Sequence, residues 1–292
     1  MIKKLAIFGN IAKEKVIAFT KEILSWCNEQ KIEVFLEESL LKKLDIDSNY
    51  PIFNNTLSND IDIILSLGGD GFLLNAAKMI YPSQTPILHI NMGQLGFTSE
   101  IDPENVFSYL AELSNREIPI QTRNMLEVKV LRDNRVILED VGLNDVVIQK
   151  DTHSRIVLLE MKIEKEAVAN FYGDGLIIST PTGSTAYNLG AGGPILYPTL
   201  SCFVITPICP HNLAQRSIIL PNDLSIEVIH RKRKSLESIV AIVDGHSWTK
   251  IDEGDRIIIK KSKFPINLVF EDNMHYFKNL KEKLHWGGLL NV

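Results

Sequence analysis

The stretch Ile61-Asp-Ile-Ile-Leu-Ser-Leu-Gly-Gly-Asp-Gly71 decides the fold of the first part of this chain. Its first seven residues are almost all apolar, which is typical of a strand buried on both faces of a sheet. The glycines and the aspartate then form a turn, and the apolar spacing of residues 72–80 predicts a helix. A buried strand that turns directly into a helix indicates a β-α-β fold with a parallel sheet.

Strand and helix patterns alternate on both sides of this stretch. Further strands are predicted at residues 4–9, 32–36 and 86–91, and helices at residues 16–27 and 103–113. We therefore predict that residues 1–118 form an α/β domain with a parallel, Rossmann-like sheet.

The pattern changes near Pro119, where alternating apolar and polar residues separated by tight turns predict a series of strands. One predicted hairpin turn is Arg132-Asp-Asn-Arg135. We predict an all-β domain over residues 119–272. In the remaining segment, residues 273–292, a helix from Tyr276 to Leu284 is expected to return and pack on the first domain.

The composition is that of an ordinary globular protein long enough for two domains, with 292 residues, 45% hydrophobic and 23% charged. A net charge of -5 argues against a nucleic-acid partner. The three cysteines form no Cys-x-x-Cys pair, so we expect no disulfide framework and a cytoplasmic location. No apolar stretch is long enough to span a bilayer, so no membrane partner is expected.

Asp70 lies between glycines, after a strand and before a helix, where ligands gather in open α/β sheets. Glycine N–H groups and a helix N-terminus favour phosphate, but a carboxylate repels it. Asp70 fits this place if it orients a hydroxyl and takes its proton while the hydroxyl attacks a phosphoryl group. A Gly/Asp turn without chemistry explains the same four residues equally well.

A second candidate site is Phe171-Tyr-Gly-Asp-Gly-Leu-Ile-Ile-Ser-Thr-Pro-Thr-Gly-Ser-Thr-Ala-Tyr187. Its acid can accept from ribose or amide donors, its hydroxyls can bind base edges, and its tyrosine can stack on a base. Asn144-Asp145 could hold the two hydroxyls of one ribose. The alternatives are helix capping for the hydroxyls, a core position for the tyrosine and an Asx turn for Asn144-Asp145.

Other nucleotide motifs are missing from the sequence. No Gly-x-x-x-x-Gly-Lys-Ser/Thr loop indicates a Walker-type ATPase, and no Gly-x-Gly-x-x-Gly fingerprint follows the first strand, as a dehydrogenase would have. The scattered histidines suggest no zinc site, and His89 is interpreted as a core or strand-end residue.

Five blocks, in order along nearly the whole chain, resemble the NAD kinase family. They are Leu67-Gly-Gly-Asp-Gly71, Asn91-Met-Gly-Gln-Leu-Gly-Phe97, Leu143-Asn-Asp-Val146, Asp174-Gly-Leu-Ile-Ile-Ser-Thr-Pro-Thr-Gly-Ser-Thr-Ala-Tyr187 and Lys283-Leu-His-Trp286. The Thr-Pro-Thr-Gly-Ser-Thr-Ala-Tyr part is highly specific. Gly-Gly-Asp-Gly is shared with diacylglycerol kinases, sphingosine kinases and phosphofructokinases.

The resemblance implies that ATP phosphorylates the 2′-hydroxyl of the adenosine ribose of NAD, giving NADP, with Asp70 as proton acceptor. It implies a divalent metal, Mg or Mn, brought mainly with ATP, and no metal-ligating residue is predicted. It also implies a homodimer or homotetramer. Two alternatives remain: another Gly-Gly-Asp-Gly kinase with a lipid or sugar substrate, and a non-catalytic NADP-binding sensor.

The resemblance assigns binding of the dinucleotide to a set of residues in both predicted domains. They are Gly71, Phe97, Asn144, Asp145, Arg155, Asp174, Thr182, Thr185, Ala186, Tyr187, Asn188, Gly190 and His246. Two positions depart from the family pattern: Gln94 stands where many members have a basic residue, and Gly190 where a serine is common.

Overall fold

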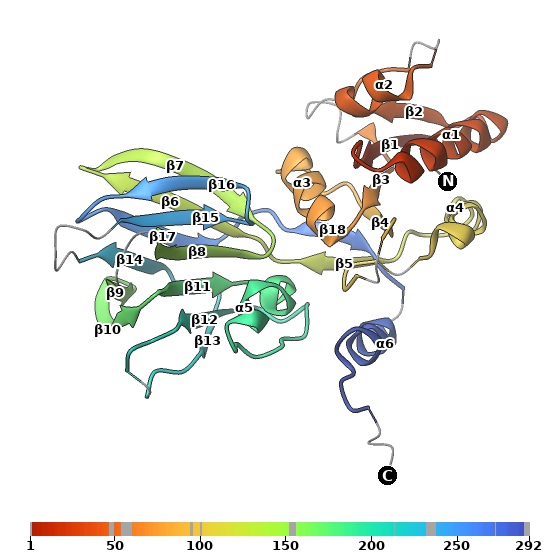
Figure 1. Cartoon of the computed structure of the whole chain (residues 1–292). Coiled ribbons are helices and arrows are strands. Elements are labelled where there is room, and N and C mark those ends of the chain that lie inside the picture. Colours follow the sequence, from red (N-terminus) through yellow and green to blue (C-terminus); the bar gives the residue numbers. More distant parts are fainter. Residues whose placement is uncertain are drawn as a thin grey trace. The chain divides into compact units, whose positions relative to one another are not determined.

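The computed structural model describes residues 2–46, 50–53, 60–93, 96–99, 101–151, 156–212, 214–231, 238–271 and 273–288. The chain folds into two compact units (Figure 1). The first comprises Met1–Thr122 and Ile266–Val292, and the second comprises Arg123–Pro265. Among the described residues, no helix has both the length and the apolar character needed to cross a membrane.

The first unit contains a six-stranded sheet with the order β2-β1-β3-β4-β18-β5. Its strands are β1 (Lys4–Gly9), β2 (Glu33–Leu36), β3 (Ile63–Gly68), β4 (Ile87–Asn91), β5 (Ile120–Arg123) and β18 (Ile266–Val269). Strands β2, β1, β3, β4 and β18 pair in parallel. The predicted α/β unit with a parallel sheet is confirmed, because an apolar strand such as β3, buried at every residue, needs cover on both faces.

Helices lie between successive strands of this sheet and after the last one. Those between strands are α1 (Glu14–Glu29), α2 (Glu38–Leu44), α3 (Asp70–Ile80), a 3-10 turn (Pro103–Asn105) and α4 (Val106–Leu113), and α6 (Asn273–Leu284) follows β18. Helix α1 buries Val16, Phe19, Ile23 and Cys27 at the spacing that predicted it. Helix α2 was not predicted. The C-terminal helix α6 belongs to the first unit, as predicted, and the side chain of Asn279 donates to the carbonyl of Ser99 at 3.5 Å.

The second unit is built from two antiparallel six-stranded sheets, so the predicted all-β domain is confirmed. Their orders are β10-β9-β14-β17-β6-β7 and β13-β12-β11-β8-β15-β16. The strands are β6 (Leu126–Arg132), β7 (Arg135–Gly142), β8 (Asp145–Lys150), β9 (Val157–Ile163), β10 (Glu166–Gly173), β11 (Gly175–Ser179), β12 (Cys202–Ile208), β13 (Ile218–Pro221), β14 (Ile226–His230), β15 (Ile239–Val243), β16 (Ser247–Ile251) and β17 (Arg256–Lys261).

Alternating side chains of the two sheets form one core in the second unit. Examples are Leu126, Val128 and Val130 from β6 and Phe203 and Ile205 from β12. The predicted hairpin turn after β6 is confirmed, because Asp133 and Asn134 have φ angles of 48° and 61°. Positive φ at both central residues is the type I′ geometry that suits a two-residue hairpin.

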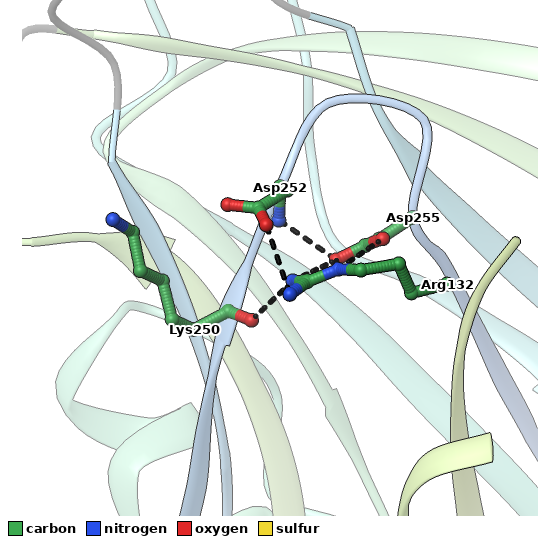
Figure 2. Close-up of polar contacts among 4 residues, drawn as sticks. All are labelled: Arg132, Lys250, Asp252 and Asp255. Carbon is green, nitrogen blue, oxygen red and sulfur yellow. Dashed lines mark hydrogen bonds and ion pairs between the residues drawn. The ribbon is translucent and has the colours of Figure 1, made fainter. Parts of the chain in front are cut away.

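An ionic network centred on Arg132 links the two sheets of the second unit. Figure 2 shows the guanidinium of Arg132, on β6, bonded to the carboxylates of Asp255 at 2.7 Å and Asp252 at 2.9 Å. It also donates to the carbonyl of Lys250, on β16, at 3.1 Å. Asp255 is only 2% exposed, so its charge requires this partner.

The short strands β5 and β18 belong to the sheet of the first unit, although both were expected in the β-rich domain. Residues 119–272 were assigned to the β-rich domain, but β5 and β18 lie in the sheet of the first unit. Leu268 of β18 pairs in parallel with Ile87 of β4. The sequence pattern of a four-residue strand shows only that it is a strand, whereas its hydrogen-bond partner decides its sheet.

Candidate functional site

Asp70 is the first residue of α3, which begins two residues before the predicted start of this helix. Strand β3 ends at Gly68, so the carboxylate stands where a parallel strand meets a helix N-terminus. Its Oδ2 atom accepts the backbone N–H of Phe97 at 3.0 Å, and its Oδ1 atom accepts the hydroxyl of Thr98 at 2.8 Å. The ammonium group of Lys283 lies 3.3 Å from Oδ2.

The surroundings of Asp70 favour its ionised form. Burial alone raises the pKa of this carboxyl group, but the hydrogen bonds from Phe97 and Thr98 and the charges of Lys283 and His89 lower it further than burial raises it. Burial lowers the pKa of His89 to about 4, so this histidine is neutral at neutral pH and adds little charge there. Asp70 is therefore a carboxylate at neutral pH, ready to accept a proton.

Gly96 allows the segment before Phe97 to approach Asp70. A Cβ atom at residue 96 would collide with Oδ1 of Asp70 and lie 2.9 Å from the side-chain nitrogen of Asn91. Only glycine fits this close approach. Gly71, in contrast, has open space around the position of a Cβ atom.

The second unit contains a cavity of about 250 Å³ that combines three segments. It is lined by Asn144 from the turn between β7 and β8, by Asp145 at the start of β8, by Ala186 and Tyr187, and by Asp244 and Gly245 from the turn between β15 and β16, together with Val147, Gln149 and Ile242. Ala186 links the 3-10 turn Thr182–Thr185 to the short helix α5 (Tyr187–Gly190), of which Tyr187 is the first residue. Polar groups around a small partly apolar cavity suit a nucleoside.

The loop of residues 179–185, here called the hydroxyl-rich loop, is hydrogen-bonded to the main chain of Asn144. Thr180 donates its N–H to the carbonyl of Asn144 at 2.8 Å, and the hydroxyl of Ser179 donates to the same oxygen at 3.1 Å. A Cβ atom at Gly183 would collide with this carbonyl and lie 2.6 Å from the Cα atom of Asn144. Gly183 therefore lets the loop pack directly against Asn144, one of the predicted ribose-binding residues.

Asp244 also lines the cavity, holds the main chain of residues 143–145 and was missed by the sequence analysis. Its carboxylate accepts the backbone N–H groups of Leu143 at 2.7 Å, Asn144 at 2.8 Å and Asp145 at 3.0 Å. Asp244 and Gly245 have φ angles of 49° and 72°, as in a type I′ turn. The Asp-Gly pair between two apolar runs predicts this turn, but nothing local predicts its three distant hydrogen bonds.

Asp145 is 5% exposed and faces a second carboxylate. Burial, and then the charge of Asp244, raise the pKa of Asp145 to about 7. Burial also raises the pKa of Asp244, although its three backbone hydrogen bonds oppose the change. At neutral pH the carboxyl group of Asp145 can therefore either donate a hydrogen bond to a sugar hydroxyl or accept one.

Comparison with known proteins identifies the family of the chain. The model of the ATP-NAD kinase N-terminal domain matches residues 5–118, and that of the ATP-NAD kinase C-terminal domain matches residues 143–270. The NAD kinase of Thermoanaerobacter sp. (strain X514) is 38% identical over 284 residues, which cover 97% of this chain and 99% of the relative. The chain belongs to the NAD kinase family.

A second relative, the NAD kinase of Nitrosomonas europaea, is 33% identical over 99% of this chain and 97% of its own length. The predicted family and enzyme class, a phosphotransferase, are confirmed. Membership decides among the kinases that share Gly-Gly-Asp-Gly, and it favours NAD kinases over lipid or sugar kinases.

Solved structures of family members share the fold. Yeast NADH kinase complexed with NADH superimposes with a TM-score of 0.91 at 23% identity, covering 100% of this chain and 89% of the other. An NAD kinase from Archaeoglobus fulgidus in complex with ATP gives a TM-score of 0.74 at 24% identity, covering 97% and 98%. The predicted two-domain fold is thereby confirmed.

Within this family member, the predicted residues of the hydroxyl-rich loop and of the start of α5 differ in exposure. Tyr187 is 46% exposed and lines the cavity, and Thr185 is half-buried. Thr182 is buried, and its hydroxyl has no hydrogen-bond partner among the described residues. Asn188 is fully buried and bonds the carbonyls of Ser184 and Pro194 and the hydroxyl of Thr206. Its side chain thus holds the loop from inside, and a contact with the dinucleotide stays a prediction.

The other predicted residues of the second unit lie outside the lining of the 250 Å³ cavity. Asp174 forms an ion pair with Lys150 at 2.8 Å, with about a third of each side chain exposed. The ring Nδ1 of His246 lies 2.6 Å from the carbonyl of Asp244. Gly190 is exposed, and a Cβ atom there would make only ordinary contact with Tyr187. Arg155 and Gln94 lie outside the described residues.

A cavity of about 570 Å³ in the first unit was also missed by the sequence analysis. It is lined by Gly9, Asn10, Ile11, Glu37, Ser39, Phe72, Asn75, Lys78 and Met79. It lies at the carboxyl ends of β1 and β2 and beside α3, where the strand order changes direction between β1 and β3. Ligands of open α/β sheets bind at such switch points.

The raised pKa of Asp145 predicts a pH-dependent cost to stability. Its pKa in the unfolded chain is about 3.9. The folded state prefers the protonated form, so its contribution is fully present below that value and is lost as the pH rises towards about 7. We expect Asp145→Asn to gain free energy of unfolding relative to the unmodified protein between pH 4 and pH 8. Urea unfolding of both proteins across this range is the measurement, and a difference independent of pH would contradict the prediction.

Proposed function

We propose that the protein transfers the γ-phosphoryl group of ATP to the 2′-hydroxyl of the adenosine ribose of NAD and so forms NADP. The observation that carries this proposal is the ionised carboxylate of Asp70, held by Phe97 and Thr98 at a helix N-terminus, in a member of the NAD kinase family. A ribose hydroxyl is a weak nucleophile at neutral pH. A carboxylate within hydrogen-bond reach orients it and accepts its proton as the new bond to phosphorus forms.

The cavity of the second unit suits the adenosine part of NAD. Asn144 and Asp145 would bind the ribose hydroxyls, since an amide and a carboxyl group together supply donors and acceptors. Tyr187 offers an exposed ring on which adenine can stack. The roles of Gly71, Phe97, Asp174 and the other family positions stay predictions.

We expect Tyr187→Ala to weaken NAD binding about tenfold, because base–aromatic stacking is worth about 1–3 kcal/mol. Folding should change little, since almost half of the side chain is exposed. Calorimetric titration with NAD and a melting curve measure the two effects, and Tyr187→Phe, which keeps the ring, is the matched control. A lower melting temperature with unchanged affinity would show a packing role instead.

The cavity of the first unit suits the nucleoside of ATP. Its volume is in the range of ligand sites, and its lining combines the apolar Ile11 and Met79 with the polar Asn10, Glu37 and Asn75. Its wall includes α3, which carries Asp70 at its first residue. We infer that the nucleoside of ATP binds here and that its phosphates extend along the turn Gly68-Gly-Asp-Gly71.

We expect Met79→Arg to raise the KM for ATP several-fold and to leave the KM for NAD unchanged, because a long cation would fill this cavity. Met79→Leu, apolar and of similar volume, is the matched control. Steady-state kinetics with each substrate varied in turn measure both constants. An equal rise in both constants would argue against a separate donor site.

The proposed reaction would use a divalent metal that arrives with ATP. Among the described residues, no group of three or more histidine, cysteine, aspartate or glutamate side chains is placed to hold a metal ion. Magnesium is usually bound through phosphates, water and one or two carboxylates, so a dedicated cage is not required. When bound, Mg or Mn would neutralise charge on the phosphates. The homo-oligomeric assembly and the cytoplasmic location stay predictions.

The decisive experiment is a turnover assay with NAD, ATP and Mg or Mn, with NADP measured by chromatography. We expect NADP to form. If well-folded protein makes none with several metals and phosphoryl donors, the proposed activity is wrong. Binding of NADP without turnover would instead support a non-catalytic sensor.

A further inference from the structure

One face of the C-terminal helix α6 is directed into the first unit. Tyr276 and Leu280 are buried, and Asn279 is 1% exposed. Lys283 lies three residues after Leu280, four after Asn279 and seven after Tyr276. Residues at these spacings share one face of a helix, so Lys283 continues this face one turn later. Lys281 also lies in the last turn but is exposed on another face.

Lys283 contacts the candidate catalytic centre at two points. Its ammonium group lies 3.3 Å from Oδ2 of Asp70, the atom that also accepts the N–H of Phe97. The same ammonium group lies 4.3 Å from the centroid of the Phe97 ring. This distance is within the range of a cation–π contact, which favours a cation over the ring face. Two independent interactions therefore hold the ammonium group at the carboxylate.

We propose that Lys283 is a positioning residue for the reaction: its ammonium group contacts and orients the carboxylate of Asp70, which makes α6 part of the active centre. The proposal rests on the proposed function, in which Asp70 accepts the proton of the ribose hydroxyl. A simpler role would be that Lys283 stabilises the C-terminus of α6, where any cation is favourable. Lys281 shares that simpler role but not the contact with Asp70.

The electrostatics of the site give the two roles different consequences. The titratable and charged groups that face Asp70 from the described elements are Lys283 on α6 and His89 on β4. His89 is neutral at neutral pH, because burial lowers its pKa to about 4. Without Lys283, the burial that raises the pKa of Asp70 would be opposed only by the hydrogen bonds from Phe97 and Thr98 and by the smaller effect of His89, which becomes charged near its pKa of about 4. Asp70 would then take up a proton at a higher pH.

The test compares three variants with the unmodified protein. We expect Lys283→Met to move the acid limb of the kcat/KM profile upward by roughly 0.5 to 1 pH unit, because a partly exposed ion pair has less effect than a buried one. On the acid side of this limb, turnover would fall about three- to tenfold further than at pH 8. Lys283→Arg keeps the charge, so its kcat/KM profile should lie close to that of the unmodified protein. Lys281→Met should leave the profile in place.

A second measurement does not depend on turnover. The ¹³C resonance of the Asp70 carboxyl group, assigned by its loss in Asp70→Asn, should titrate at higher pH in Lys283→Met than in the unmodified protein. An unshifted titration, or an equal shift in Lys281→Met, overturns the role of Lys283. Failure of the unmodified protein to form NADP overturns the proposed function instead, so the two failures are distinguishable.

Discussion

Asp70→Asn is expected to lower turnover by about 10²-fold or more while folding and NAD binding are retained. The substitution keeps the size of the side chain and an oxygen that can accept the N–H of Phe97 or the hydroxyl of Thr98. It removes the charge and the basicity, so the attacking hydroxyl loses its proton acceptor. Loss of the negative charge would also remove repulsion of a 2′-phosphate, so NADP should bind at least as tightly as before.

Steady-state turnover and calorimetric titration on the same preparation measure this prediction. Asp62→Asn is a matched control, because Asp62 also accepts backbone hydrogen bonds, from Lys3 and Lys4 at 2.7 and 2.8 Å, but is exposed outside the site. Its turnover should be unchanged. Normal turnover in Asp70→Asn would remove this carboxylate from the mechanism and leave it the role of a turn residue, which asparagine also fills.

The second large effect is expected from Gly183→Ala. The added methyl group would collide with the main chain of Asn144, which cannot retract as a side-chain tip can. Overpacking of this kind costs about 1–3 kcal/mol of unfolding free energy and sometimes more. Because Asn144 lines the nucleoside cavity, its displacement should also weaken NAD binding.

Urea unfolding and NAD titration of Gly183→Ala measure the two losses. Gly190→Ala is the control for stability, since a methyl group there would lie 3.9 Å from the ring of Tyr187, an ordinary contact. Its free energy of unfolding should stay close to that of the unmodified protein. Equal stability of the two variants would show that the loop can move away from Asn144 without loss.

The sequence by itself determined the features that depend on neighbours in the chain. The apolar run of β3 and the helix after it predicted a parallel sheet, and Arg132-Asp-Asn-Arg135 predicted a hairpin turn. The motif blocks predicted the family, and the glycines around Asp70 marked the candidate catalytic residue. Local patterns suffice here, because strand burial, turn conformation and helix spacing depend on residues a few positions apart.

The tertiary structure decided the features that depend on residues far apart. The three hydrogen bonds to Asp244 span about a hundred residues, and the contact between Lys283 and Asp70 spans 213. The need for glycine at residue 183 comes from the main chain of Asn144. The sheet that β18 joins was likewise decided by its pairing with β4. No local pattern predicts these partners, because each contact forms only when helices, strands and turns from distant parts of the chain pack together. The burial that results then shifts the pKa values of the site.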